Sequence, residues 1–102
     1  MPYIAICRDA DTSKSGELRE SYLQAHFAYI ETILDSLLIA GPAGGKSNAD
    51  FGCSVFIYDT DDRAEAERLL HEDPYYRCGL YGDVELEPFT PAAGRWIGGK
   101  IW

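Results

Sequence analysis

The stretch Leu69-Leu70-His71-Glu72-Asp73-Pro74-Tyr75-Tyr76 determines where a helix ends and where its last side chains point. Pro74 disfavours helical geometry at the residue before it, so the helix is expected to end at Asp73. At 100° per residue, Asp73 lies within about 20° of Ala66 on the apolar side, whereas His71 lies about 140° away. A carboxylate that points inward needs a hydrogen-bonding or cationic partner, because burying an unpaired charge is costly. The pattern therefore predicts a buried partner for Asp73 and a solvent-facing His71.

A longer helix upstream supplies a candidate partner. Apolar residues recur at helical spacing from about Glu17 to Leu37, and they form a stripe made of Leu23, Phe27, Ile30, Leu34 and Leu37. His26 lies about 60° from the centre of this stripe, so its imidazole is expected to point inward as well.

The other elements follow from alternation and from turn residues. Strands are expected at Tyr3–Cys7, Ile39–Ala43, Gly52–Tyr58 and Asp83–Glu87, a second helix at Asp62–Glu72, and a turn or helical hook at Tyr75–Gly82. The polar segment Arg8–Gly16 leads into the long helix, and Ser13 or Ser15 is expected to cap it. Thr60 or Asp61 is expected to cap the second helix.

This order, β-α-β-β-α-β, is that of the ferredoxin-like plait, an α+β fold with two helices on one face of an antiparallel sheet. We expect one domain over residues 1–102, with a core at 1–89 and a tail at 90–102. The strands at Tyr3–Cys7 and Gly52–Tyr58 are apolar on both faces, although two helices cover only one. A second copy packed sheet to sheet is the simplest cover, with the apolar tail closing the edge, so a homodimer or a higher assembly is predicted.

Composition limits the class of protein. With 102 residues, 46% of them hydrophobic and 13% aromatic, the chain suits one two-layer domain and not a disordered chain. No apolar run approaches the roughly 18 residues that span a bilayer, and no signal-type segment is present, so a cytoplasmic location is predicted. The net charge of −8 disfavours nucleic acid and anionic membranes, which are bound through basic faces. A small-molecule ligand or a protein partner remains open.

The pairing of His26 with Asp73 is the main chemical candidate. A carboxylate bonded to one imidazole nitrogen fixes the tautomer and raises the basicity of the other nitrogen, as a general base requires. The alternative is a structural pair, in which Asp73 caps backbone amides and His26 bonds a carbonyl group. The two histidines lack the convergent spacing of metal ligands, so no metal and no cofactor are predicted.

Three other features carry less chemistry. Residues Ala40–Ser47 fit a relaxed phosphate-loop pattern, but a strand and not a helix is expected to follow, so we expect a loop without a nucleotide role. Cys7, Cys53 and Cys78 lack the paired spacing of disulfides or zinc sites, and free, partly buried thiols are expected. Cys53 and Cys78 would be nucleophiles only with a lowered pKa, which no neighbouring residue in the sequence favours.

Six short motifs occur together in this chain. They are Ala25-His26-Phe27-Ala28-Tyr29-Ile30, Ala40-Gly41-Pro42, Ala64-Glu65-Ala66, Asp73-Pro74-Tyr75, Gly79-Leu80-Tyr81 and Pro88-Phe89. In this order they resemble the YciI-like (YCII-related) family over about Tyr3–Phe89. The resemblance implies a ferredoxin-like dimeric α/β barrel, similar to muconolactone isomerases, with a His–Asp pair in a cleft that maps onto His26 and Asp73.

The resemblance also implies proton-transfer chemistry, because a characterised relative is a dehydrochlorinase that acts on chlorinated hydroxyhydroquinones. One position departs from the family, since many members carry arginine where this chain has Leu23. If that arginine binds an anionic group of the substrate, then Arg19, one turn earlier, or Arg8 would have to replace it, or the substrate differs.

The sequence thus predicts a small lyase or isomerase in which His26, oriented by Asp73, removes a proton from a small cyclic or aromatic substrate. Backbone amides near Gly41, or an arginine, would stabilise the resulting carbanion or enolate. The alternatives are a non-catalytic small-molecule-binding or stress-response module with the same cleft, and a purely structural dimerisation domain. Beside the pair, the candidate ligand contacts are Arg8, Arg19, Gly41, Pro42, Ser54, Pro74 and Tyr75.

Overall fold

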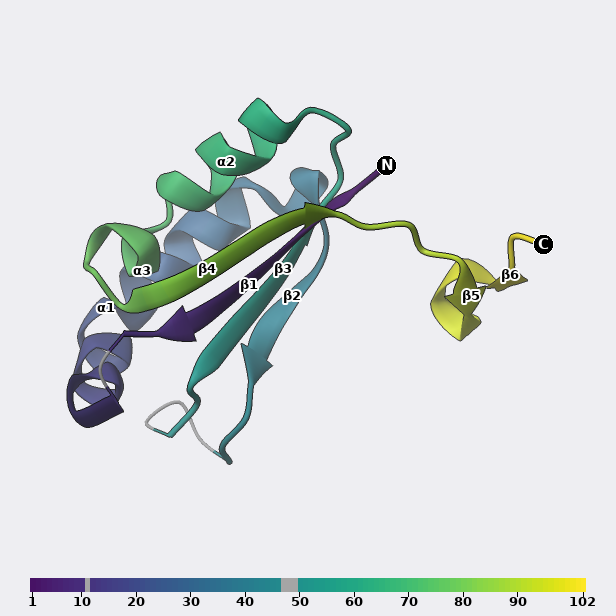
Figure 1. The fold of residues 1–102 in the computed structure, drawn as a ribbon. Helices are drawn as coiled ribbons and strands as arrows, with labels where there is room; N and C mark the ends of the chain where they lie inside the picture. Colours follow the sequence, from purple (N-terminus) through teal and green to yellow (C-terminus); the bar gives the residue numbers. More distant parts are fainter. Residues whose placement is uncertain (11, 47–49) are drawn as a thin grey trace.

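Helices pack on one face of an antiparallel sheet in the computed structural model, which describes residues 1–10, 12–46 and 50–102 (Figure 1). The elements in chain order are β1 (Tyr3–Asp9), α1 (Thr12–Thr32), the 3-10 turn η1 (Leu34–Ser36), β2 (Leu37–Ala43), β3 (Cys53–Tyr58), α2 (Arg63–His71), α3 (Pro74–Arg77), β4 (Tyr81–Pro88), β5 (Ala93–Gly94), the 3-10 turn η2 (Arg95–Ile97) and β6 (Gly99–Lys100). The predicted β-α-β-β-α-β order is confirmed, with α3 as the expected hook after Asp73.

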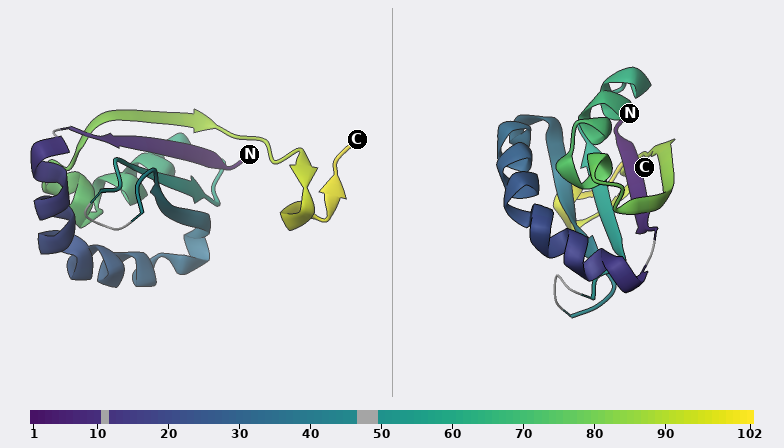
Figure 2. Two further views of the ribbon diagram at one scale, coloured as in Figure 1. Left: turned by 90° about the horizontal axis from the view of Figure 1, so that it is seen from below. Right: turned by 90° about the vertical axis from the view of Figure 1, so that its left-hand side faces the viewer.

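The sheet has four strands in the order β2-β3-β1-β4, and every neighbouring pair is antiparallel. The two central strands run in register from Tyr3 opposite Tyr58 to Arg8 opposite Cys53. Views from three directions show the helices on one side of the sheet (Figures 1 and 2). The single chain therefore forms an open sheet with one covered face and does not close into a barrel.

Strict alternation along the strands builds the core. Side chains at every second position point toward the helices and are buried, and they meet buried residues of α2; the cluster is Ala5, Cys7, Phe56, Tyr58, Leu86, Ala66, Leu69 and Leu70. The residues between them on β1 and β3 point to the opposite face, which we call the open face. Burying these apolar side chains supplies the main stabilisation of the helical layer.

The long helix begins and ends earlier than the sequence pattern predicts. It spans Thr12–Thr32, so Ser13 and Ser15 lie inside it and do not cap it, and Leu37 is the first residue of β2. Within the predicted apolar stripe, Phe27 is 50% exposed and Leu34 is 59% exposed. The reason is that polar side chains of α1 occupy part of the inward face, and a periodicity count of apolar residues does not register them.

The second helix begins one residue after its predicted start, and its cap differs from the prediction. Oδ1 of Asp62 accepts a hydrogen bond from the backbone N–H of Ala64 at 3.0 Å, so Asp62 and not Thr60 or Asp61 is the N-cap. Thr60 instead accepts a bond from the backbone N–H of Asp62 at 3.1 Å, which fixes the turn before the helix. At the other end of α2, His71 is exposed, as predicted.

The tail, residues 90–102, leaves the end of β4 and extends away from the sheet (Figures 1 and 2). It contains the two-stranded β5-β6 ribbon, with Ala93 opposite Lys100. None of the helices within the described ranges has the length and apolarity that crossing a membrane requires.

Candidate functional site

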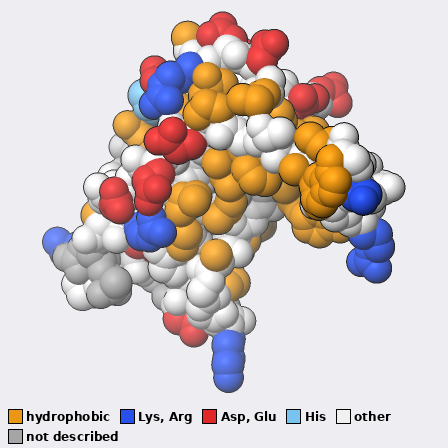
Figure 3. All heavy atoms as spheres, turned by 45° about the vertical axis from the view of Figure 1, so that its right-hand side comes forward, with side chains coloured by type: hydrophobic (Ala, Val, Ile, Leu, Met, Phe, Trp, Pro, Cys, Tyr) orange, Lys and Arg blue, Asp and Glu red, His pale blue; other side chains and the backbone are white. Residues whose placement is uncertain are grey.

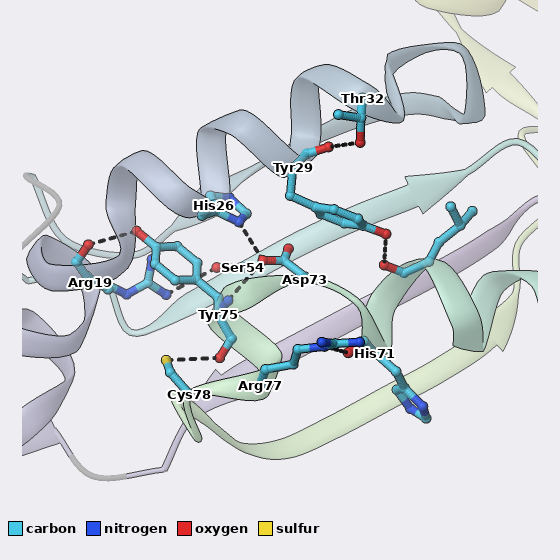
Figure 4. A network of polar contacts seen from close by, with 11 residues as sticks. Arg19, His26, Tyr29, Thr32, Ser54, His71, Asp73, Tyr75, Arg77 and Cys78 are labelled. Carbon is cyan, nitrogen blue, oxygen red and sulfur yellow. Dashed lines mark hydrogen bonds and ion pairs between the residues drawn. The ribbon is translucent and has the colours of Figure 1, made fainter.

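A histidine and an aspartate from different elements meet between the helices and the sheet. Nδ1 of His26, on α1, lies 2.7 Å from Oδ1 of Asp73, at the start of α3 (Figure 4). The Asp73 side chain is 1% exposed and the His26 side chain is 13% exposed. Since a carboxylate only accepts hydrogen bonds, Nδ1 carries the proton in this pair, and Nε2 is the nitrogen left for a ligand.

Local sequence fixes the position of Asp73. Pro74 occupies the first turn of α3, and Asp73 is its extended N-cap residue. Oδ1 of Asp73 accepts the backbone N–H of Tyr75 at 2.9 Å in addition to the bond from His26. The buried Oδ2 has no hydrogen-bond partner among the described residues. One oxygen thus holds both contacts, and a shift of Asp73 would disturb the cap and the histidine together.

Aromatic packing fixes the plane of the imidazole. The ring of His26 stacks on the ring of Tyr75, with the centroids 4.1 Å apart and the planes 11° apart, and Phe56 contacts it edge-on at 6.2 Å. The hydroxyl of Tyr75 donates to the backbone carbonyl of Arg19 at 3.0 Å, which ties α3 to α1. Two bonded ends hold Tyr75 in place, so it acts as a rigid platform for His26.

A second buried ion pair lies on the same helix, seven residues before His26. Arg19 is 1% exposed; its Nε and Nη2 donate to the two carboxylate oxygens of Asp9 at 3.0 and 2.9 Å, and Nη2 also donates to Oγ of Ser54 at 3.1 Å. Burial lowers the pKa of Arg19, but the hydrogen bonds and charge of Asp9 outweigh it, so the pKa lies above its usual value. Arg19 therefore stays charged, and Asp9 compensates that charge.

A cavity of about 300 Å³ opens beside these groups. Its walls are mainly apolar and come from α1, β2, β3 and α3; they are Arg19, Leu23, His26, Phe27, Ile30, Ala40, Gly41, Pro42, Phe51, Ser54, Phe56 and Tyr75. The volume is at the lower end of the range of about 300–1,000 Å³ for small-molecule sites, which are typically apolar with a few placed polar groups. A single basic nitrogen in an apolar cavity of this size suits proton transfer on a small, flat ligand.

Buried groups behind the pair keep their protons. Burial raises the pKa of the Cys7 thiol to about 12, with smaller contributions from the charges of Cys53, Asp73 and Asp9. Burial also raises the pKa of Tyr29 to about 12, and the hydroxyl of Tyr29 donates to the carbonyl of Leu69 at 2.6 Å. These two groups are uncharged at neutral pH, so they add no charge beside Asp73.

The structure brings most of the predicted ligand contacts to one cavity. Arg19, Gly41, Pro42, Ser54 and Tyr75 line it together with His26. Arg8 does not: it is exposed on the open face and bonds Glu85 at 2.7 Å, because side chains of β1 alternate and Arg8 follows the inward Cys7. Pro74 does not line it either, since it forms the first turn of α3. A Cβ at Gly41 would meet open space, so a close backbone approach does not explain this glycine.

Asp9 is the main site residue that the sequence reasoning missed. The sequence predicts that Asp9 lies in the polar segment Arg8–Gly16, but β1 extends to it, and alternation from Ala5 and Cys7 places it on the inward face. Continuing the alternation of β1 by one step beyond Cys7 would therefore have predicted the inward position of Asp9 from the sequence. Phe51 lies between β2 and β3, and no local pattern indicates that it lines the cavity.

The phosphate-loop pattern and metal binding can be assessed from the same structure. The described residues between β2 and β3 contain no helix, while Ser47 lies outside the described residues. No group of three or more His, Cys, Asp or Glu side chains gathers in the part of the chain that the structure describes. The three cysteines are free thiols.

Fold and site together define a small α+β plait with a His–Asp pair beside an apolar cavity. The sequence profile of the YCII-related domain matches residues 1–90, and the chain therefore belongs to the YCII-related family. The prediction of this family from six short motifs is confirmed.

Solved structures share this fold. One similar structure is that of 5-chloro-2-hydroxyhydroquinone dehydrochlorinase from Burkholderia phenoliruptrix AC1100, in complex with 2,5-dihydroxybenzoquinone. The match has a TM-score of 0.78 and 22% sequence identity, and it covers 93% of this chain and 97% of that chain. An uncharacterized NIPSNAP domain protein from Burkholderia xenovorans is also similar, with a TM-score of 0.50 and 19% identity over 91% of this chain and 96% of that chain. No curated protein matches the sequence. At these identities the two structures support the fold.

Proposed function

We propose that this protein is a small enzyme of lyase or isomerase type, in which His26 moves a proton on a small cyclic or aromatic metabolite. The observation that carries the proposal is the 2.7 Å bond between Nδ1 of His26 and buried Asp73, with His26 in the wall of a cavity. Family membership and the fold of the dehydrochlorinase support an enzyme of this kind.

The charges at the cavity favour a neutral substrate. The charge of Arg19 is compensated by Asp9, so it offers little attraction to an anion. Asp73 adds a negative charge behind His26, and the rest of the wall is mainly apolar. Leu23 lines the cavity, and many family members carry arginine at this position. Without that positive charge, the cavity has a still lower affinity for anionic groups. A neutral ring with an acidic C–H or O–H bond fits these walls.

The proposed step needs only a base and an acceptor for electrons. Nε2 of His26 takes the proton, the electron pair of the broken bond moves into the ring, and Asp73 stabilises the imidazolium that forms. Returning the proton to another ring position gives an isomerisation, whereas departure of a leaving group with its electron pair gives an elimination. Because β2 is an edge strand, we expect backbone N–H groups near Gly41 that face away from β3 to donate to a ring oxygen and stabilise charge on it.

The test compares wild-type protein with His26→Asn on a panel of hydroxylated benzenes and cyclic ketones. The panel includes 5-chloro-2-hydroxyhydroquinone, with chloride release as the readout. NMR detects proton transfer on the other compounds as incorporation of solvent deuterium into ring positions. Thermal melting of both proteins controls for folding.

The enzyme proposal expects turnover or deuterium incorporation by the wild type and its loss in His26→Asn at an unchanged melting temperature. Binding of a panel compound without any proton transfer would instead indicate the non-catalytic binding module. A variant that only loses stability, with no ligand found for either protein, would indicate that the pair is structural.

A further inference from the structure

Two buried polar atoms near the His–Asp pair have no hydrogen-bond partner among the described residues. They are Oδ2 of Asp73 and the hydroxyl oxygen of Tyr81. Charged side chains on the surface, which Figure 3 shows in red and blue, are solvated by water. A buried polar atom lacks this contact, and native proteins rarely leave one unpaired. Each of the two atoms therefore needs a partner.

The two atoms lie in the same layer, between α3 and the sheet. Tyr81 is the first residue of β4 and is opposite Asp9 of β1. Its ring packs edge-on against the ring of Tyr75, with the centroids 6.4 Å apart, and the backbone N–H of Tyr75 donates to Asp73 at 2.9 Å. Burial raises the pKa of the Tyr81 hydroxyl, and the charge of Asp73 raises it further, as expected for neighbouring groups.

Ser54 is a third polar group in this layer. Its Oγ accepts a hydrogen bond from Nη2 of Arg19 at 3.1 Å. Ser54 and the charge of Arg19 both lower the pKa of Tyr81, although the two hydroxyls form no hydrogen bond of good geometry with each other. Tyr81 thus lies between the two buried ion pairs, and the positive charge of Arg19 makes this layer unfavourable for a cation.

The two atoms without partners are chemically complementary. The raised pKa of Tyr81 keeps its hydroxyl protonated at neutral pH, so it can donate, whereas a carboxylate oxygen only accepts. The two atoms do not bond each other. A water molecule can accept from the hydroxyl and donate to the carboxylate, and Ser54 supplies the further polar contact that buried waters typically have.

We propose that a water molecule is bound between Oδ2 of Asp73 and the hydroxyl of Tyr81, and that Tyr81 is a positioning residue for the His–Asp pair. With the water in place, both carboxylate oxygens of Asp73 are bonded, so the carboxylate cannot rotate and Oδ1 stays aimed at His26. The bridge also connects this pair, through Ser54, to Arg19. The water site does not rest on the proposed function; only its effect on proton transfer does.

Crystal structures of the free protein test the water and the role of Tyr81 together. The wild type is expected to show a water about 2.5–3.0 Å from both Oδ2 of Asp73 and the hydroxyl of Tyr81. Tyr81→Phe keeps the ring and removes only the hydroxyl, so it is expected to lose the water and to show the Asp73 carboxylate in more than one orientation. Tyr29→Phe is the matched control, because the hydroxyl of Tyr29 donates to the backbone of Leu69, and it is expected to keep the water.

Kinetics test the positioning role on the panel compound that reacts fastest. Tyr81→Phe is expected to lower kcat roughly tenfold at an unchanged KM, because Asp73 loses one of the bonds that hold its charge in place. Tyr29→Phe is expected to leave kcat nearly unchanged. In the Asp73→Asn background, Tyr81→Phe is expected to have little further effect, since the charge through which it acts is already gone.

Four results would overturn the proposal. A wild-type structure without this water, or with the Tyr81 hydroxyl bonded directly to a protein group, contradicts the water site. A water that remains in Tyr81→Phe shows that Tyr81 does not hold it. A single, unchanged orientation of Asp73 in Tyr81→Phe contradicts the positioning role, and so does an equal fall in kcat in the Asp73→Asn background. If no panel compound reacts, the proposed function fails, and the crystal structures alone decide on the water and the positioning.

Discussion

Replacing Asp73 by asparagine separates the charge of this residue from its shape. The carboxylate accepts two bonds, from His26 Nδ1 at 2.7 Å and from the Tyr75 amide at 2.9 Å, and the residue is 1% exposed. Asparagine is about as good an N-cap as aspartate, and its carbonyl oxygen can accept both bonds. The folded structure is therefore expected to survive the change.

The magnitudes follow from the kind of bond that is lost. The free energy of unfolding is expected to change by less than about 1 kcal/mol, since both contacts remain as neutral hydrogen bonds. A buried, charge-assisted bond to an imidazolium is worth about 1.5–3 kcal/mol, and its loss slows proton transfer about 10- to 100-fold. Asp73→Ala, by contrast, removes the cap and leaves Nδ1–H unpaired, and it is expected to cost about 2–4 kcal/mol of stability.

The assay is urea unfolding of wild type, Asp73→Asn and Asp73→Ala, combined with deuterium incorporation or turnover on the best panel compound. The reasoning predicts a stable but slow asparagine variant and a destabilised alanine variant. An asparagine variant as fast as the wild type would refute a role for the charge of Asp73 in the reaction. An asparagine variant that unfolds would show that the carboxylate is needed for the fold.

Three further predictions concern stability. Arg19→Met leaves the buried Asp9 carboxylate without its cation and is expected to lower the free energy of unfolding by about 3–5 kcal/mol. The double variant Arg19→Met/Asp9→Leu removes both charges and is expected to restore most of this stability. Equal urea midpoints for the single and the double variant would contradict the prediction. Gly82→Ala places a Cβ 2.6 Å from Cα of Ala10 and is expected to cost about 1–3 kcal/mol, whereas Gly52→Ala, which meets open space, is expected to leave the urea midpoint nearly unchanged. Between about pH 9 and pH 12 the free energy of unfolding is expected to fall by about 1.4 kcal/mol per pH unit on account of Cys7 once the unfolded thiol ionises, because burial raises its pKa to about 12 from 9.0. The thiol keeps its proton longer in the folded chain, so its contribution is complete below the unfolded pKa and is lost as the pH rises; an unchanged slope in Cys7→Ala would contradict the assignment.

The inward placement of Asp73 and His26 could be predicted because each depends on local rules. Pro74 fixes the helix end before it, and the period of the helix fixes the side of α1 on which His26 lies. That the two side chains lie 2.7 Å apart is a tertiary fact. It depends on how α3 packs against α1, which neither pattern contains. The stacking of His26 on Tyr75 likewise depends on how α3 packs against α1.

The errors on α1 have one physical cause. Arg19 is buried on the inward face, whereas Phe27 is half exposed in the cavity wall. A count of apolar residues assumes that only apolar side chains face inward, and it fails where a charge has a partner in another element. The partner, Asp9, falls in a segment that the sequence pattern predicts to be a polar loop. The inward position of Arg19 could be foreseen only together with that of Asp9.

A crystal structure of the protein with the uncharged panel compound that binds most tightly tests the central claim most directly. The account predicts the ring in the cavity between α1 and β2, with one of its atoms within about 3 Å of Nε2 of His26, while Nδ1 keeps its bond to Asp73. A ligand bound elsewhere, or Nε2 turned away to bond a group of the protein, would contradict it.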